Sequence, residues 1–228
     1  MSGYRHELKF LLSAEEAEYL AKRLRLAMQP DPHAGPTGRY LIRSLYFDTP
    51  FDRAVEEKVS GVEFRDKYRI RIYNYTDKTI KFERKHKNGP LIKKESVSLT
   101  RQQCDAVIAG EYGFLLHKKE PFAKELYAAL RTEYWRPKVL VDYEREPFIF
   151  PLEDVRVTFD RDVRTGLHCT DLFNPRAVMI PATEYGSGCI LEVKYNRYLP
   201  AFVRMLIQTD ASLHTAASKY LACRQFDF

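Results

Sequence analysis

The chain has 228 residues, 45% of them hydrophobic, and carries a formal net charge of +6 at pH 7. This composition excludes a disordered or low-complexity chain, and the positive charge favours an anionic partner. Neither a signal peptide nor a membrane-spanning apolar stretch is recognisable, which predicts a cytoplasmic protein with one domain, residues 1–228. The four cysteines form no CxxC pair, so we expect reduced thiols and no zinc site.

The N-terminal part of the chain predicts a strand, a helix and a second strand. The stretch "RHELKFLL" (5–12) alternates charged and apolar residues, as a half-buried strand does. Ser13 can cap a following helix, and Glu16 completes a capping box. A loop rich in proline and glycine (29–38) then leads into the strand "RYLIRSLYFD" (39–48).

The rest of the chain predicts six more strands, at residues 62–74, 79–87, 91–99, 138–148, 154–163 and 189–196. Helices are expected after Thr100, over 121–134, and near 200–208 and 214–223. About eight strands at this spacing are typical of an antiparallel barrel. We therefore predict an α+β fold, an eight-stranded antiparallel β-barrel (tunnel) with flanking α-helices.

Five of the predicted strands have one charged face and one apolar face. In "KYRIRIYN" (67–74), three cations alternate with Tyr68, Ile70 and Ile72, and successive side chains of a strand point to opposite faces. The charged faces of the five strands carry Lys67, Arg69 and Arg71; Arg5, Glu7 and Lys9; Lys81, Glu83 and Lys85; Arg156, Thr158 and Asp160; and Glu192 and Lys194.

These charged faces have two interpretations. Antiparallel sheets commonly have one side in water, and a single strand of this kind needs no other explanation. However, the amphipathic helices need an apolar surface to cover, which places the apolar faces outside the barrel and the charged faces inside. An interior crowded with arginine and lysine is costly unless an anion fills it. A phosphate chain would do so, and some of the carboxylates would hold a divalent metal that bridges phosphates.

Seven short motifs occur in an order that resembles the VTC domain, the polyphosphate polymerase module of the CYTH-like triphosphate tunnel metalloenzymes. They are "RHELKF", "LYFDT", "KYRIRIYN", "IKFERKHKNG", "VRVTFDRDV", "ILEVKYN" and "ASKYL", and the resemblance runs from about residue 4 to 225. It implies an eight-stranded tunnel that uses ATP and a divalent metal, Mn²⁺ or Mg²⁺, to extend inorganic polyphosphate and release ADP. A membrane-protein partner for product export is a possible further partner.

Carried over residue by residue, the resemblance implies a role for each charged position. Residues expected to act on the transferred phosphates are Lys9, Arg69, Arg71, Lys81, Arg156 and Lys219. Residues expected to bind substrate are Arg5, Lys67, Lys85, Lys194 and Ser218. Glu192 resembles the metal-binding carboxylate, with Glu7 and Glu83 as further candidates. Glu192 has a second interpretation as an ion-pair partner of Lys194 or of an arginine.

Several alternatives remain open in the sequence. Arg5 stands where the sister triphosphatases and cyclases have the first Glu of an ExExK pattern, which favours a polymerase over a tunnel triphosphatase or a non-catalytic sensor. Alternation does not decide whether Lys93 or Lys94 faces the tunnel. The basic stretch "ERKHK" (83–87) also fits a groove for RNA, but its alternation favours a strand face, so no nucleic acid is expected. Asp142, Glu144 and Glu146 are expected at a solvated edge or in salt bridges.

Overall fold

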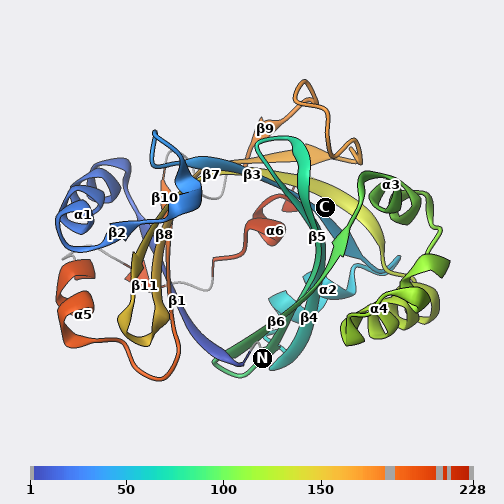
Figure 1. Ribbon diagram of the computed structural model, residues 1–228, viewed down its shortest axis with the longest axis horizontal. Coiled ribbons are helices and arrows are strands. Elements are labelled where there is room, and N and C mark those ends of the chain that lie inside the picture. The colour runs from blue at the N-terminus through green and yellow to red at the C-terminus, as the bar shows by residue number, and fades with distance from the viewer. Residues whose placement is uncertain (1–2, 183–187, 209–212, 215–216, 226–228) are drawn as a thin grey trace.

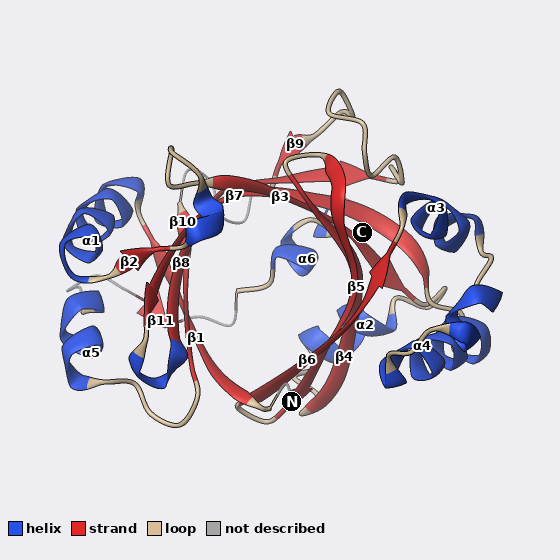
Figure 2. Cartoon of the chain, viewed as in Figure 1, coloured by secondary structure: helices blue, strands red, loops and turns tan. Residues whose placement is uncertain are grey.

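Eight antiparallel strands close into a barrel in the computed structural model, which describes residues 3–182, 188–208, 213–214 and 217–225 (Figure 2). Around the ring the order is β7–β3–β4–β5–β6–β1–β10–β8, and β8 pairs with β7 to close it. The eight strands are β1 (Arg5–Leu12), β3 (Tyr40–Asp48), β4 (Phe64–Tyr73), β5 (Thr76–Asn88), β6 (Leu91–Leu99), β7 (Arg136–Phe150), β8 (Val155–Leu167) and β10 (Cys189–Tyr195). The predicted barrel is confirmed.

Three two-residue strands extend the sheet outside this ring. They are β2 (Gln29–Pro30), which pairs with β7; β9 (Ile180–Pro181), which pairs with β8; and β11 (Leu213–His214), which pairs with β1. The helix expected over 214–223 is shorter than predicted: within the described residues it is α6 (Lys219–Ala222), and residues 215–216 lie outside them.

The strand boundaries differ from the prediction at the end of β8, which runs four residues beyond 163 to Leu167, and at the β4–β5 turn. The gap expected at 75–78 is a two-residue turn, in which Asn74 and Tyr75 have positive φ angles of 49° and 58°. A turn with two left-handed residues matches the right-handed twist of its strands and lets both strands continue to its ends. The turn has Tyr where Gly is usual, so the sequence did not mark it. Strand β5 begins three residues earlier than expected, at Thr76.

Helices cover the outside of the barrel on two opposite sides (Figure 1). Helices α1 (Ala14–Ala27) and α5 (Ala201–Ile207) lie on one side, and α3 (Arg101–Ala109) and α4 (Pro121–Thr132) lie on the other. Both predicted capping boxes are present, at Ser13 and at Thr100. Helix α2 (Arg53–Val59) was not expected, because its first flanking residue, Asp52, has a left-handed conformation and makes no side-chain cap.

The apolar strand faces pack under these helices in two clusters. One cluster joins Leu20 and Leu24 of α1 to Leu191 and Val193 of β10, and all four are fully buried. The second joins α3 and α4 to the outer faces of β4, β5 and β6. Burying one such side chain is worth about 1.5–3 kcal/mol, so the outer faces supply much of the free energy that holds the barrel closed. This arrangement leaves the charged faces for the interior.

Arg43 and Asp142 form a buried ion pair on the outer side of the barrel. The Arg43 guanidinium donates to both carboxylate oxygens of Asp142, at 2.8 and 2.7 Å, and both residues are almost fully buried. Glu144 pairs with Arg39 at 3.0 Å, and Glu146 with Arg161 at 2.8 Å. The salt-bridge interpretation of these three carboxylates is therefore confirmed, and the solvated-edge interpretation is wrong for Asp142 and Glu146, which are buried.

Two general predictions concern thiols and membranes. All four cysteines are free in the structure. Among the described residues, no helix combines the length and the apolar character needed to cross a membrane.

Candidate functional site

The charged strand faces meet in the interior of the barrel, which we call the lumen. The Lys85 ammonium on β5 donates to Glu7 on β1 at 2.7 Å, although β6 lies between these two strands. Arg71 on β4 likewise donates to the Tyr143 hydroxyl on β7 at 3.2 Å, with β3 between them. Side chains of strands that are not neighbours touch in this way because they point to the inside of the ring.

One group of charges in the lumen is built on β1 and β10. Lys9 lies opposite Glu192, and Glu7 lies opposite Lys194, in the register of these two strands. The Lys9 ammonium is 3.5 Å from Glu7 and 3.4 Å from Glu192, while the Lys194 ammonium is 3.7 Å from Glu7 and 2.8 Å from Glu192. Two carboxylates thus share two lysines.

A second group surrounds Glu83 on β5. Arg69 lies opposite Glu83 in the β4–β5 register and pairs with it at 2.9 Å. Arg71 lies 3.8 Å from the same carboxylate, and Lys94 on β6 lies 2.9 Å from it. Lys94 therefore faces the lumen, whereas Lys93 pairs with Glu95 on the outer face, which decides the choice that alternation left open. Glu83 therefore pairs with three cations, and none of them contacts Glu7 or Glu192 in the described structure.

Helix α6 lies inside the ring of strands (Figure 1). Its Lys219 ammonium contacts Asp160 at 2.5 Å and Glu192 at 3.6 Å, and the ring of Tyr220 stacks on Tyr46 at 5.1 Å between centroids. Ser218, which caps the helix, accepts a hydrogen bond from Lys67 at 2.8 Å. The predicted Ser218–Lys219 pair is therefore placed beside the strand charges by a segment near the end of the described chain.

Arg145 and Asp160 belong to the lumen but were not selected as site residues from the sequence. Arg145 donates to both oxygens of Asp160, at 2.6 and 2.7 Å, and lies 3.4 Å from Glu192. The alternation of Asp142, Glu144 and Glu146 already placed Arg145 on the opposite face, so a signal existed. The sequence does not show that this opposite face points into the barrel, which only the closed sheet decides.

Three predicted phosphate-binding residues already have partners at partly exposed positions. Arg5, with a side chain 44% exposed, pairs with Asp154. Lys81 donates to the Ser98 hydroxyl at 2.5 Å. Arg156, with a side chain 36% exposed, donates to Asp31 at 2.5 Å and to the Tyr40 hydroxyl at 2.9 Å. These three are less enclosed by other charges than Lys9, Arg69 and Arg71.

The lumen shifts the pKa values of its groups in opposite directions. Burial would raise the pKa of Glu7, but the Lys85 ammonium and other lysines outweigh burial and hold it at about 2. Burial would also raise the pKa of Glu192, yet Lys194, Lys219 and Lys9 hold it well below its usual range. Burial lowers the pKa of Lys85 to about 7, against the pull of Glu7, and burial with nearby ammonium groups lowers that of Lys67. The carboxylates are therefore ionised, and the lumen contains more positive charge than it can easily hold.

Several buried polar atoms on the lumen face make no hydrogen bond in the described part of the chain. They are Ser44 Oγ, Arg71 Nε, Arg156 Nε and Thr158 Oγ1. Buried donors of native proteins are nearly always satisfied, by protein, ligand or water. Arg71 is notable because its neighbour Arg69 is well satisfied, by Glu83 at 2.9 Å and by the Tyr46 hydroxyl at 2.7 Å. Arg71 thus retains a donor for a further partner.

The family model of the VTC domain matches residues 4–227 of the chain. The chain belongs to the VTC domain family. Two solved structures resemble this VTC domain in fold. One is a proposed adenylyl cyclase from Hippeastrum, described as having a dominant triphosphatase activity, with a TM-score of 0.58, 14% identity, and coverage of 97% of this chain and 96% of that one. The other is a proposed adenylate cyclase from Bacillus halodurans, with a TM-score of 0.50, 16% identity, and coverage of 84% and 81%. No curated protein matches the chain.

Glu7 and Glu192 offer the donors that a hard divalent cation prefers. Within the described residues, no three His, Cys, Asp or Glu side chains are grouped so that they could hold a metal by themselves. Hard divalent cations prefer oxygen ligands, and one or two carboxylates together with substrate phosphates and water commonly hold Mg²⁺. Glu83 lies apart from this pair, because its own partners are Arg69, Arg71 and Lys94.

Proposed function

We propose that this VTC domain is an ATP- and divalent-metal-dependent polyphosphate polymerase, which transfers the γ-phosphoryl group of ATP to inorganic polyphosphate within the lumen. The observation that carries the proposal is the excess of cations there. The described part of the lumen holds four carboxylates, Glu7, Glu83, Asp160 and Glu192, and nine cationic side chains. The cations are Lys9, Lys67, Arg69, Arg71, Lys85, Lys94, Arg145, Lys194 and Lys219. A polyanion is the ligand that would balance this charge.

The reaction would depend on positioning and charge neutralisation. Phosphoryl transfer needs little covalent help from a protein, because charge spreads over the oxygens of the transferred group. Arg69 and Arg71 would hold phosphate oxygens through their planar guanidinium groups, and Lys9 on β1 and Lys219 on α6 would neutralise the phosphate charge. The attacking group is the terminal phosphate of the chain, which is largely ionised at neutral pH, so no side chain has to act as a general base.

Glu192 and Glu7 would hold the divalent cation, Mn²⁺ or Mg²⁺. When bound, such a cation supplies charge stabilisation to the phosphate oxygens. Lys9 and Lys194 bridge the two carboxylates and would turn toward the phosphates where Glu7 and Glu192 hold a cation. The side chains of both lysines are partly exposed, at 18% and 27%, which leaves them room to do so.

A tunnel triphosphatase is the second candidate function. The position of α6 favours it, because a helix inside the ring leaves less room for a long chain than for a triphosphate. The Hippeastrum structure, described as having a dominant triphosphatase activity, has the same fold. Polymer extension would then require α6 to move, whereas hydrolysis of a triphosphate would not.

Incubation of the pure protein with ATP and MnCl₂ tests the proposal directly. We expect a ladder of polyphosphate on a gel together with stoichiometric ADP. Release of orthophosphate without a ladder would assign the chain to the triphosphatases instead. Binding of ATP without turnover would indicate a sensor. Omission of the metal and addition of EDTA are the controls, and both should abolish the ladder.

Binding of a polyanion should also be coupled to proton uptake by lumen lysines. In the free protein, burial lowers the pKa of Lys85 to about 7 and that of Lys67 below its usual value. Bound phosphates favour the charged ammonium forms, so the complex holds more protons than the free protein, and affinity rises as the pH falls from about 9 to about 7.

Calorimetry of inorganic triphosphate at pH 8, in two buffers with different ionisation enthalpies and without metal, measures this proton uptake. The ligand has its own titrating phosphates, so Lys85→Arg is the matched comparison, since a guanidinium stays charged throughout. The variant should take up fewer protons than the wild type. Equal proton uptake by the two proteins would show that Lys85 is already charged in the free lumen.

A further inference from the structure

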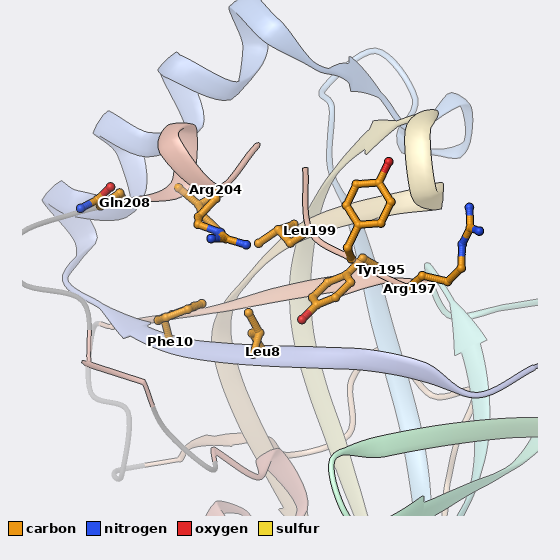
Figure 3. Close-up of a pocket in the computed structure, with 9 residues that line it drawn as sticks. Leu8, Phe10, Tyr195, Arg197, Leu199, Arg204 and Gln208 are labelled. Carbon is orange, nitrogen blue, oxygen red and sulfur yellow. The ribbon is translucent and has the colours of Figure 1, made fainter. Parts of the chain in front are cut away.

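A cavity of about 650 Å³ lies outside the barrel, between the outer faces of β1 and β10 and helix α5 (Figure 3). Its floor consists of Leu8 and Phe10 from β1 and Tyr195 at the end of β10, and Leu199 and Ile207 close it from the side of α5. Arg197, Tyr198, Arg204 and Gln208 complete its lining. The lumen residues Glu7, Lys9 and Lys194 lie on the other face of the same strands, so this cavity is separate from the tunnel.

Helix α5 is short, and the apolar strand faces near it are only partly covered. The helix has only seven residues, Ala201–Ile207. Leu191 and Val193 of β10 are fully buried, whereas Leu8, Phe10 and Tyr195 next to them remain half-exposed. Tyr195 is fixed from outside the cavity by the ring of His6, stacked at 5.0 Å between centroids. An apolar floor that is held in place but incompletely covered is a preformed binding surface.

Arg204 provides the single unpartnered charge at this cavity. Its guanidinium is exposed, points toward Leu199 at the cavity, and makes no hydrogen bond or ion pair within the described residues (Figure 3). The neighbouring arginines are already engaged. Arg197 pairs with Glu153 at 2.7 Å, and Arg23 donates to the backbone oxygen of Met205 at 3.1 Å. None of the nine lining residues is acidic, so nothing in the lining neutralises Arg204.

We propose that this cavity binds an amphiphilic anion, in which an unbranched alkyl chain covers Leu8, Phe10 and Ile207 and an anionic head pairs with Arg204. The volume lies within the range of about 300–1,000 Å³ that small-molecule sites occupy, and such sites combine an apolar lining with a few polar groups. The Arg204 guanidinium, unpaired within the described residues, would repel the head of a cationic amphiphile. The alkyl anion comes either from solution or from the surface of an anionic membrane. This site is independent of the phosphate chemistry proposed for the lumen.

Titration calorimetry of the whole chain with decanoate, below the concentration at which it forms micelles, tests the proposal. Decanoate should bind in a saturable manner and roughly tenfold more tightly than decanol, the neutral analogue. Binding should strengthen roughly fourfold for each methylene from octanoate to decanoate, as alkyl burial predicts. Arg204→Ala should reduce the affinity for decanoate to that for decanol and leave the affinity for decanol unchanged.

Arg131→Ala is the matched control, since Arg131 is an exposed arginine of α4 on the opposite side of the barrel. It should bind decanoate as the wild type does. Flotation with phosphatidylglycerol vesicles distinguishes the source of the anion. If the wild type floats with the vesicles and Arg204→Ala does not, the anion comes from a membrane. If the wild type binds decanoate but does not float, the anion comes from solution. The proposal is overturned if the wild type binds neither decanoate nor the vesicles, or if Arg204→Ala binds decanoate as tightly as the wild type does.

Discussion

Glu192→Gln is expected to lower turnover of ATP by on the order of 100-fold or more, since a bound divalent cation contributes several kcal/mol to charge stabilisation in such reactions. Glutamine keeps the size of the side chain and removes the charge that would attract Mn²⁺ or Mg²⁺. The carboxylate lies within 3.6 Å of Lys9, Lys194, Lys219 and Arg145. Loss of one negative charge among four cations should therefore maintain or strengthen metal-free binding of polyphosphate.

The same contacts give Glu192 a purely structural interpretation, and the variant separates the two. Initial rates with ATP and MnCl₂, and calorimetry of polyphosphate without metal, are the two measurements. Glu83→Gln is the matched control, because Glu83 is also a buried lumen carboxylate held by cations. If Glu192→Gln melts at a lower temperature but retains most of its activity, Glu192 is an ion-pair partner only. A collapse of turnover in Glu83→Gln instead would place the metal at that residue.

Arg71→Ala is expected to weaken the binding of ATP and polyphosphate by about 1.5–3 kcal/mol, the usual range for a charge-assisted hydrogen bond. Arg71 is 6% exposed, and its Nε makes no hydrogen bond within the described residues. Folding should survive the substitution, because Glu83 keeps Arg69 and Lys94 as partners and one source of repulsion in the lumen is removed.

Arg84→Ala is the control for this prediction, since Arg84 follows Glu83 on β5 and points to the outer face. It pairs there with Glu95 at 2.5 Å and Glu125 at 2.6 Å. Its loss should affect the melting temperature more than the affinity. Calorimetry with non-hydrolysable ATP and with polyphosphate gives the affinities of both variants. Unchanged affinity in Arg71→Ala would mean that the lumen face of β4 does not hold the phosphates.

The strand pattern predicted the barrel well because alternation is a local property of the chain. Lys67, Arg69 and Arg71 alternate with residues that are fully or nearly fully buried under helices, among them Ile70 at 0% exposure. Two local features were less predictable. The turn at Asn74 and Tyr75 lacks the glycine that usually marks it, and α2 begins without a capping side chain at Asp52. In both places the tertiary structure stabilises a backbone conformation that the local sequence does not predict.

The sequence alone determined which side chains share a face, and hence that cations from five strands would line one surface. It could not determine which of these charges would touch. The contacts of Lys85 with Glu7, and of Lys219 with Asp160, join residues 78 and 59 positions apart in the chain, across strands that are not neighbours or from a helix inside the ring. Only closure of the barrel fixes those distances, because strand order and the inward path of α6 depend on packing between distant segments. Ion pairing and pKa shifts follow from distance and burial, and so the tertiary structure decided which charges are neutralised and which remain for a ligand.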